Sequence, residues 1–207
     1  MTGVQTCALP ISSILSFQYH FYKGVYVIRT FVAVDIPAAF HAKISAIQSK
    51  FIGPGLRPVD PSIVHITMKF LGDVDEAQLP GIITALDRMD CPSFDSRISG
   101  VGAFPGMKNP RVVWLGADGD YSCLHGQLES LLSETGFKKE PRKFIPHATL
   151  ARITYLSNPR KKELISAIDP LRDLDVGLMR VNTVKLKKST LTPQGPIYET
   201  LHEVDLP

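Results

Sequence analysis

Two short segments of the sequence carry side chains suited to proton transfer. His65–Met68 reads His-Ile-Thr-Met and His147–Leu150 reads His-Ala-Thr-Leu, with His147 placed 82 residues after His65. In a strand, residues i and i+2 point to the same face, so each segment would present an imidazole beside a hydroxyl group. Two such strands side by side would offer an acid, a base and two hydroxyl donors. Breaking a phosphodiester without a metal ion requires this set of groups.

The composition makes the repeated His-x-Thr-x motif difficult to explain by chance. With 6 His, 12 Thr and 44% apolar residues in the chain, random expectation is about 0.07 matches. A single histidine on a strand is more often structural than catalytic, and this holds for either motif taken alone. The presence of two such motifs favours a catalytic role for their histidines over a structural one. We therefore predict that His65 and His147 are catalytic and that Thr67 and Thr149 bind substrate.

The segments around the two motifs repeat at the same spacing. Arg29–Asp35 and Arg111–Asp118 both have the apolar and β-branched composition of strands, and Arg111 follows Arg29 by 82 residues. Each is followed by apolar residues at helical spacing. These are Phe40, Ile44, Ile47 and Phe51 in the first copy, and Leu124, Leu128, Leu131 and Leu132 in the second. The sequence thus predicts a duplication, folded as two lobes related by a pseudo-twofold axis with the active cleft between them.

The remaining patterns indicate an α+β fold with two mainly antiparallel sheets and outer helices. A helix is expected from a cap at Asp75 to about Met89, with a late start or a kink at Pro80, and another from Asn158 and Pro159. Strands are expected at Phe94–Val101, Val176–Lys187 and Ile197–Leu206, the last two separated by a turn at Thr192–Gly195. A chain of this length is one globular unit or two closely packed lobes.

The charge of the chain is small overall but locally uneven. A net charge of +3 does not indicate a large nucleic-acid footprint. A group of basic residues nevertheless flanks the second motif against a single acid, Glu140: Lys138, Lys139, Arg142, Lys143 and Arg152. This group is either a solvated face or a local field that attracts a phosphate to His147, and the sequence leaves both readings open.

The cysteines and the apolar segments indicate in which cellular compartment the protein is expected. Cys7, Cys91 and Cys123 are an odd number without the spacing of a disulfide framework, which indicates a reducing cytoplasm. The segment Ile11–Ile28 is only moderately apolar and has no basic residues before it, so no membrane span is predicted. We expect a cytoplasmic monomer.

The N-terminal residues have an unusual reverse translation. Residues 1–12 resemble the in-frame translation of a common sequencing adapter, and Lys23–Val25 can be encoded by a ribosome-binding sequence a few bases before Val27. The hypothesis is that residues 1–26 are a non-native or disordered extension. Residues 27–207 would then form the whole two-lobed domain.

From about Val27 to the C-terminus, several segments resemble one family: Arg29–Pro37, His65–Gly72, Gly102–Pro105, Pro110–Trp114, Pro146–Arg152 and Ser189–Tyr198. Together with the paired motifs they resemble the 2H phosphoesterase superfamily, and within it the RNA 2′,3′-cyclic phosphodiesterases, historically called 2′-5′ RNA ligases. The resemblance implies a bilobal fold with both histidines in a cleft that binds a cyclic phosphate.

The resemblance also implies residue roles. It makes His65 the proton donor, His147 the proton acceptor and Arg152 a substrate-binding residue, in an enzyme that opens RNA 2′,3′-cyclic phosphate ends to 2′-phosphates without metal or cofactor. The near symmetry of the two motifs does not by itself decide which histidine is the acid. Lys69 or Phe70 could contact a base or ribose, although core packing is the expectation for Phe70.

Other functions remain open at the level of sequence. The same chemistry suits small cyclic nucleotides, an RNA-end exonuclease or reversible 2′-5′ RNA joining without ATP. A non-catalytic module that binds RNA ends is the alternative from another class. Intact His and Thr in both motifs argue against it, because binding alone does not require two imidazoles.

Overall fold

The computed structural model describes residues 20–22 and 25–207. Most of the predicted extension 1–26, including the adapter-like residues 1–12, therefore lies outside the described residues. Within that range the structure describes β1 (His20–Tyr22), which pairs antiparallel with the start of β2.

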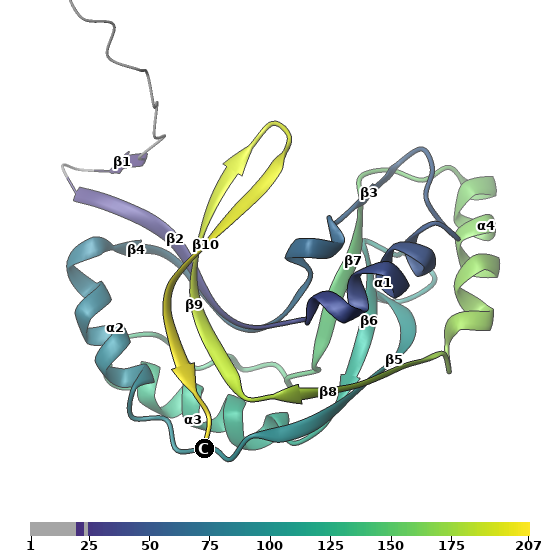
Figure 1. The fold of residues 1–207 in the computed structure, drawn as a ribbon. Helices are drawn as coiled ribbons and strands as arrows, with labels where there is room; N and C mark the ends of the chain where they lie inside the picture. Colours follow the sequence, from purple (N-terminus) through teal and green to yellow (C-terminus); the bar gives the residue numbers. More distant parts are fainter. Residues whose placement is uncertain (1–19, 23–24) are drawn as a thin grey trace, which may run out of the picture.

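The chain forms an α+β fold, as the sequence predicts (Figure 1). The longer strands are β2 (Val25–Asp35), β4 (His65–Asp75), β5 (Phe94–Phe104), β6 (Val112–Asp118), β7 (His147–Ile153), β8 (Asp175–Val181), β9 (Thr183–Thr192) and β10 (Gly195–Asp205), and β3 (Leu56–Pro58) is short. The α-helices are α1 (His41–Gln48), α2 (Leu79–Leu86), α3 (Tyr121–Glu134) and α4 (Asn158–Ile168).

The strands form one curved antiparallel sheet with the order β10-β9-β2-β4-β7-β6-β5-β8. Its two halves, β10-β9-β2-β4 and β7-β6-β5-β8, are joined where Ile66 pairs with Ala148. The two sheets expected from the sequence are thus halves of a continuous sheet. The motif strand β4 borders β2 in one half and β7 borders β6 in the other. A duplication predicts this mirrored order.

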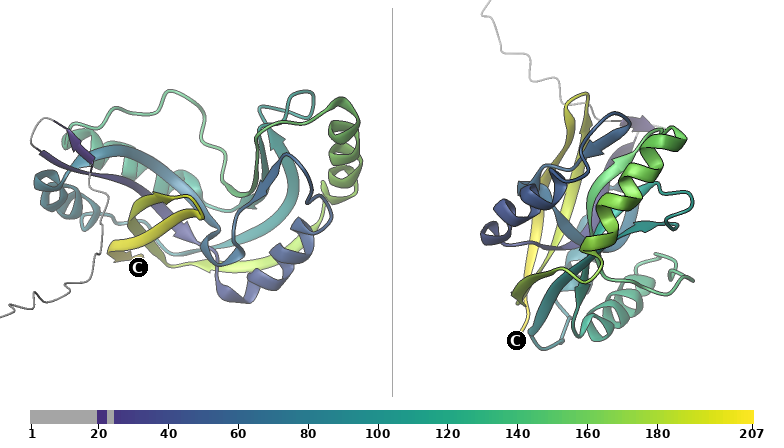
Figure 2. Two further views of the ribbon diagram at one scale, coloured as in Figure 1. Left: turned by 90° about the horizontal axis from the view of Figure 1, so that it is seen from above. Right: turned by 90° about the vertical axis from the view of Figure 1, so that its right-hand side faces the viewer.

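The helices cover the two halves in a crossed arrangement. Helix α1 follows β2 but packs against β7, whereas α3 follows β6 but packs against β4 and α2. Figures 1 and 2 show α2 and α3 over one half and α1 and α4 over the other. The apolar faces predicted for α1 and α3 are buried. Asp75 forms a capping box at the short 3₁₀ turn before α2, so Pro80 falls in the first turn of that helix, where its missing N–H is tolerated.

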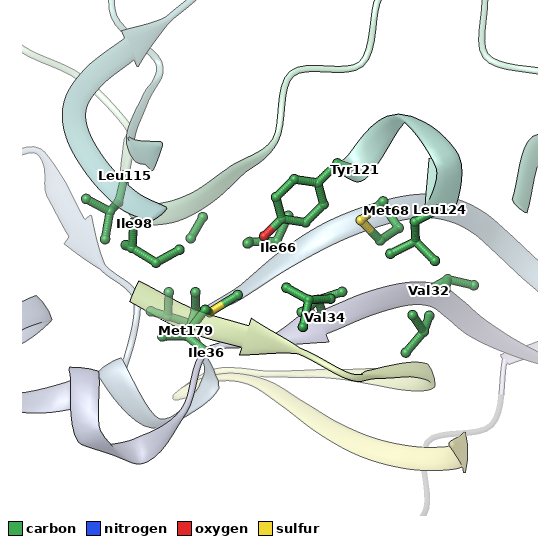
Figure 3. Close-up of a cluster of buried hydrophobic side chains, with 14 of the residues drawn as sticks. Val32, Val34, Ile36, Ile66, Met68, Ile98, Leu115, Tyr121, Leu124 and Met179 are labelled. Carbon is green, nitrogen blue, oxygen red and sulfur yellow. The ribbon is translucent and has the colours of Figure 1, made fainter. Parts of the chain in front are cut away.

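The hydrophobic core lies beneath the motif strands (Figure 3). Ile66 and Met68 of β4 are buried against side chains of β2 and α3. Those partners include Val32, Val34, Tyr121 and Leu124. Burying one such aliphatic side chain stabilises the fold by about 1.5–3 kcal/mol. The apolar positions of the motif thereby hold the alternate residues, His65 and Thr67, on the opposite face.

Two features depart from the sequence expectation. The single strand expected at Val176–Lys187 is two strands, β8 and β9, which separate at Asn182 and join opposite halves of the sheet. The apolar alternation changes phase at this point, from Met179 and Val181 to Val184 and Leu186, and the prediction of one strand overlooked that change. Cys91 and Cys123 form a disulfide between the segment after α2 and helix α3. The cysteine spacing did not indicate it, and the cysteines therefore do not support the reducing cytoplasm that was inferred from them.

Candidate active site

The two His-x-Thr-x motifs lie on neighbouring antiparallel strands. Because Ile66 of β4 pairs with Ala148 of β7, the register puts His65 level with Thr149 and Thr67 level with His147. Each imidazole therefore has the hydroxyl of the other motif as its cross-strand neighbour. The structure brings together all four residues that the sequence singled out.

The apolar residues of both motifs are buried on the other face of the sheet, so the four polar side chains share one face. We call this the motif face, defined by His65, Thr67, His147 and Thr149. It spans the junction between the two halves of the sheet, where the sequence placed the site.

Both imidazoles are held in the same way. Nδ1 of His65 is 2.8 Å from the carbonyl oxygen of Ile63, and Nδ1 of His147 is 2.7 Å from that of Ile145. A carbonyl oxygen only accepts, so Nδ1 carries the proton in both rings. Nε2 is therefore the atom of each ring that can exchange a proton with a substrate. Such an Nε2 accepts a proton when the ring is neutral and donates one when the ring is protonated.

Aromatic rings fix the orientation of the imidazoles further. Phe31 stacks on His65 with 4.9 Å between ring centroids, and the Tyr198 ring meets His65 edge-on at 5.1 Å. Phe104 meets His147 edge-on at 4.9 Å. The motifs alone did not indicate these contacts, because β2, β10 and β5 supply the rings. All three rings do lie in segments that carry the family resemblance: Phe31 in Arg29–Pro37, Phe104 in Gly102–Pro105 and Tyr198 in Ser189–Tyr198.

Burial and nearby charges act on the titration of His65. Burial lowers the pKa of His65, and the positive charges of Lys187 and Arg152 lower it further, whereas the hydrogen bond to Ile63 and the charge of Asp35 oppose the shift. In the protein without substrate, this environment favours the neutral imidazole.

The same charges form a network across three strands. Asp35 pairs with His65 across the β2–β4 ladder. Its carboxylate accepts a 2.5 Å hydrogen bond from Nζ of the buried Lys187, and Nζ of Lys185 lies 3.5 Å from its second oxygen. Sequence reasoning missed this network, because Asp35 and Lys187 lie 152 residues apart.

A β-bulge follows the threonine in each motif strand. Ala33 pairs with Thr67, whereas the adjacent residue Val32 pairs with Lys69, two residues further along β4. In β7, likewise, Thr149 pairs with Trp114, whereas Ala151 pairs with the adjacent residue Val113. The extra residue shifts the alternation, so the residues five places after each histidine return to the motif face. These residues are Phe70 and Arg152, and both are exposed. The charge of Arg152 acts on His65 and on Tyr198, which places its guanidinium near them.

The bulge also corrects the expectation for Phe70. Its side chain is 68% exposed rather than packed in the core. Lys69 is buried instead, and its Nζ donates hydrogen bonds to Oε1 of Glu129 at 2.6 Å and to the carbonyl oxygen of Lys138 at 2.9 Å. After the bulge, the side chains of β4 alternate with a shift of one residue from the simple pattern that the prediction assumed.

The basic group before the second motif lies on the connection between α3 and β7. Residues 138–143 are all exposed. Within the described part of the chain, no carboxylate forms an ion pair with Lys138, Lys139, Arg142 or Lys143. The connection is anchored by Lys69, by a 2.8 Å hydrogen bond from the Glu140 N–H to Glu129, and by Phe144 stacked on His125.

Two kinds of feature are absent from the described residues. They contain no group of three or more His, Cys, Asp or Glu side chains arranged to hold a metal ion. They also contain no helix long and apolar enough to cross a membrane.

Comparison with known proteins gives consistent matches. The family model described as LigT-like phosphoesterase matches residues 34–114 and again 120–198. An RNA 2′,3′-cyclic phosphodiesterase of Methanocaldococcus jannaschii is 38% identical over 176 residues, which cover 84% of this chain and 99% of that protein.

Solved structures agree. A crystal structure of a Thermus thermophilus protein superposes with a TM-score of 0.73 at 27% identity, covering 86% of this chain and 98% of that one. Escherichia coli LigT complexed with 3′-AMP shares the fold, with a TM-score of 0.71, 24% identity, and coverage of 87% of this chain and 98% of that one.

Proposed function

The chain belongs to the LigT-like phosphoesterase family and is a phosphoesterase, and we propose that it hydrolyses RNA 2′,3′-cyclic phosphate ends to 2′-phosphomonoesters. The arrangement that carries the proposal is the pair of imidazoles on adjacent strands, each with Nδ1 held by a carbonyl oxygen and with no hydrogen bond at Nε2 from the residues that the structure describes. The names of the relatives support the substrate.

The proposed reaction is one in-line displacement at phosphorus. Nε2 of neutral His147 accepts a proton from water as the water oxygen bonds to phosphorus. The bond from phosphorus to O3′ breaks, and Nε2 of protonated His65 donates its proton to O3′. Each proton transfer contributes roughly 10²–10⁴-fold to the rate. Exchange with solvent then restores both protonation states.

The assignment of His65 as the acid rests on the family resemblance and requires the protonated ring. Burial and two nearby cations disfavour that form in the free protein. A bound phosphate brings negative charge, which favours it. In this proposal, therefore, binding of the substrate favours the protonated form of His65, which then acts as the acid.

The remaining groups on the motif face stabilise charge. Thr67 and Thr149 would donate hydrogen bonds to the non-bridging oxygens, where charge accumulates in the transition state. Arg152 would add a permanently charged planar donor beside His65. No metal or nucleotide cofactor is needed for this sequence of steps.

Of two further features, one suits either substrate and the other favours RNA over a small cyclic nucleotide. Phe70 offers an exposed ring on the motif face on which the base of either substrate can stack. The cations of residues 138–143, which form no ion pair within the described part of the chain, offer contacts for a longer polyanion. The proposal includes a cytoplasmic monomer whose residues 27–207 form two pseudo-twofold lobes, with residues 1–26 as a non-native or disordered extension.

The experiment is hydrolysis of 2′,3′-cyclic AMP and of a short RNA ending in a cyclic phosphate, in EDTA, with the product resolved as 2′- or 3′-phosphate. We expect 2′-phosphate from both, with a higher kcat/KM for the RNA. Joined RNA products without ATP would instead support ligation. Binding of the RNA end without turnover would support the non-catalytic module.

A further inference from the structure

Two arginines face each other across the short ladder between β3 and β7. Arg57 pairs with Arg152, while the neighbouring pair, Leu56 and Ile153, is buried. Residues directly opposite each other in a sheet point to the same face, and consecutive residues alternate. Both arginines therefore project from the side of the sheet away from the core, and both are exposed.

This like-charge pair has no acidic partner. Like charges directly opposite each other destabilise a sheet. Among the residues that the structure describes, no carboxylate forms an ion pair with Arg57 or Arg152. Guanidinium groups bind phosphate with two parallel hydrogen bonds, so a phosphate placed between them would relieve the repulsion.

The pair extends outward from the motif face. The charge of Arg152 acts on His65 and Tyr198. His65 is level with Thr149 of β7, whereas Arg57 is level with Arg152, three residues further along. Because of the bulge, these three steps match only two residues of β6, from Trp114 to Val112, so the distance is about 7 Å along the strand at about 3.4 Å per residue. Arg57 thus lies beside Arg152, further along β7 from the position of the reacting phosphate at the two motifs.

We propose that Arg57, together with Arg152, binds a second phosphate of the RNA, the phosphodiester on the 5′ side of the terminal nucleotide. The inference rests on the proposed function and deepens it, because it names the group by which the site distinguishes RNA from a mononucleotide. A 2′,3′-cyclic mononucleotide has no phosphate at that position, so Arg57 has nothing to hold in that substrate.

The kinetic test uses Arg57→Gln, with Lys162→Gln as a matched control. Lys162 is exposed on α4, and its replacement also removes one positive charge from the protein. The substrates are a trinucleotide ending in a 2′,3′-cyclic phosphate and 2′,3′-cyclic AMP. We expect Arg57→Gln to lower the ratio of kcat/KM for RNA to kcat/KM for cyclic AMP about tenfold, the size expected for a hydrogen bond to a charged group. Lys162→Gln should keep the ratio of the unmodified protein.

The binding test does not depend on turnover. A fluorescent trinucleotide ending in a 2′-phosphate is titrated by anisotropy at several salt concentrations. Loss of one phosphate contact should make the slope of log K against log salt shallower by about 0.7. Arg57→Lys should keep the slope but bind more weakly than the unmodified protein, because lysine keeps the charge and loses the planar pair of donors.

The outcomes separate the two proposals. An equal loss on both substrates would overturn the inference, since it would place Arg57 at the cyclic phosphate or in a purely structural role. An unchanged ratio with an unchanged salt slope would also overturn it. If the unmodified protein turns over neither substrate, the proposed function fails, and the salt slope of Arg57→Gln still decides whether a phosphate is bound there.

Discussion

Ile66 and Ala148 pair directly across the junction between the two halves of the sheet. Because of this pair, each motif's histidine lies level with the other motif's threonine. The site is therefore completed by contact between the halves, and neither half carries it alone. Both residues are buried, so apolar packing under the junction holds the polar face above it.

Truncating the junction should cost stability. Ile66 is fully buried, so Ile66→Ala should lower the free energy of unfolding by about 2–5 kcal/mol through lost burial and the resulting cavity. Urea unfolding measures the change. Ile197→Ala, at an exposed isoleucine, is the control and should change stability little. Equal effects of the two substitutions would show that Ile66 does not support the junction.

The electrostatic network around His65 predicts a titration shift. Burial and nearby cations lower the pKa of His65 below its ordinary value of 6.5. Lys187→Met removes one of those cations and leaves Asp35 less neutralised, so the pKa of His65 should rise. NMR titration of the His65 ring measures it, with Lys162→Met as the control. A decrease, or no change, would contradict the network.

The choice of acid can be tested with an activated leaving group. Nitrophenolate departs without protonation, so a nitrophenyl phosphodiester does not need the acid. His65→Ala should therefore lose much less activity on this ester than on a cyclic phosphate, whereas His147→Ala should lose activity on both. Steady-state rates of both variants on both substrates give the comparison. The reverse pattern would make His147 the acid.

Phe70 should matter for substrate and little for stability. Base stacking on an aromatic side chain is worth about 1–3 kcal/mol, so Phe70→Ala should raise KM for cyclic nucleotides about tenfold or more. Its exposed ring predicts only a small change in thermal stability, whereas the buried Phe31 should cost about 3–5 kcal/mol when truncated to alanine. A large loss of stability without a change in KM would make Phe70 a packing residue.

Local patterns in the sequence predicted the parts of the site that depend on neighbours along the chain. The alternation in His65–Met68 and His147–Leu150 places imidazole and hydroxyl on one face. The equal spacing of the repeats predicted that the two strands would meet. The apolar spacing in α1 and α3 was sufficient to identify their buried faces.

Features that depend on pairing were not visible in the sequence. A β-bulge is an extra residue relative to a partner strand, so the strand's own sequence did not show that Phe70 would return to the motif face. The Asp35–Lys187 ion pair joins residues from different ends of the chain. The phase change between Val181 and Val184 marks the division between β8 and β9, but it does not show which strand each segment pairs with.

The central claim is that His65 and His147 act as acid and base in one step. The most direct test compares kcat on an RNA 2′,3′-cyclic phosphate end for His65→Ala, His147→Ala and the double variant. Each single variant should lose roughly 10²–10⁴-fold. The double variant should lose little more than either, because groups that act in one step are not additive. Full activity in His65→Ala, or losses that multiply in the double variant, would contradict the mechanism.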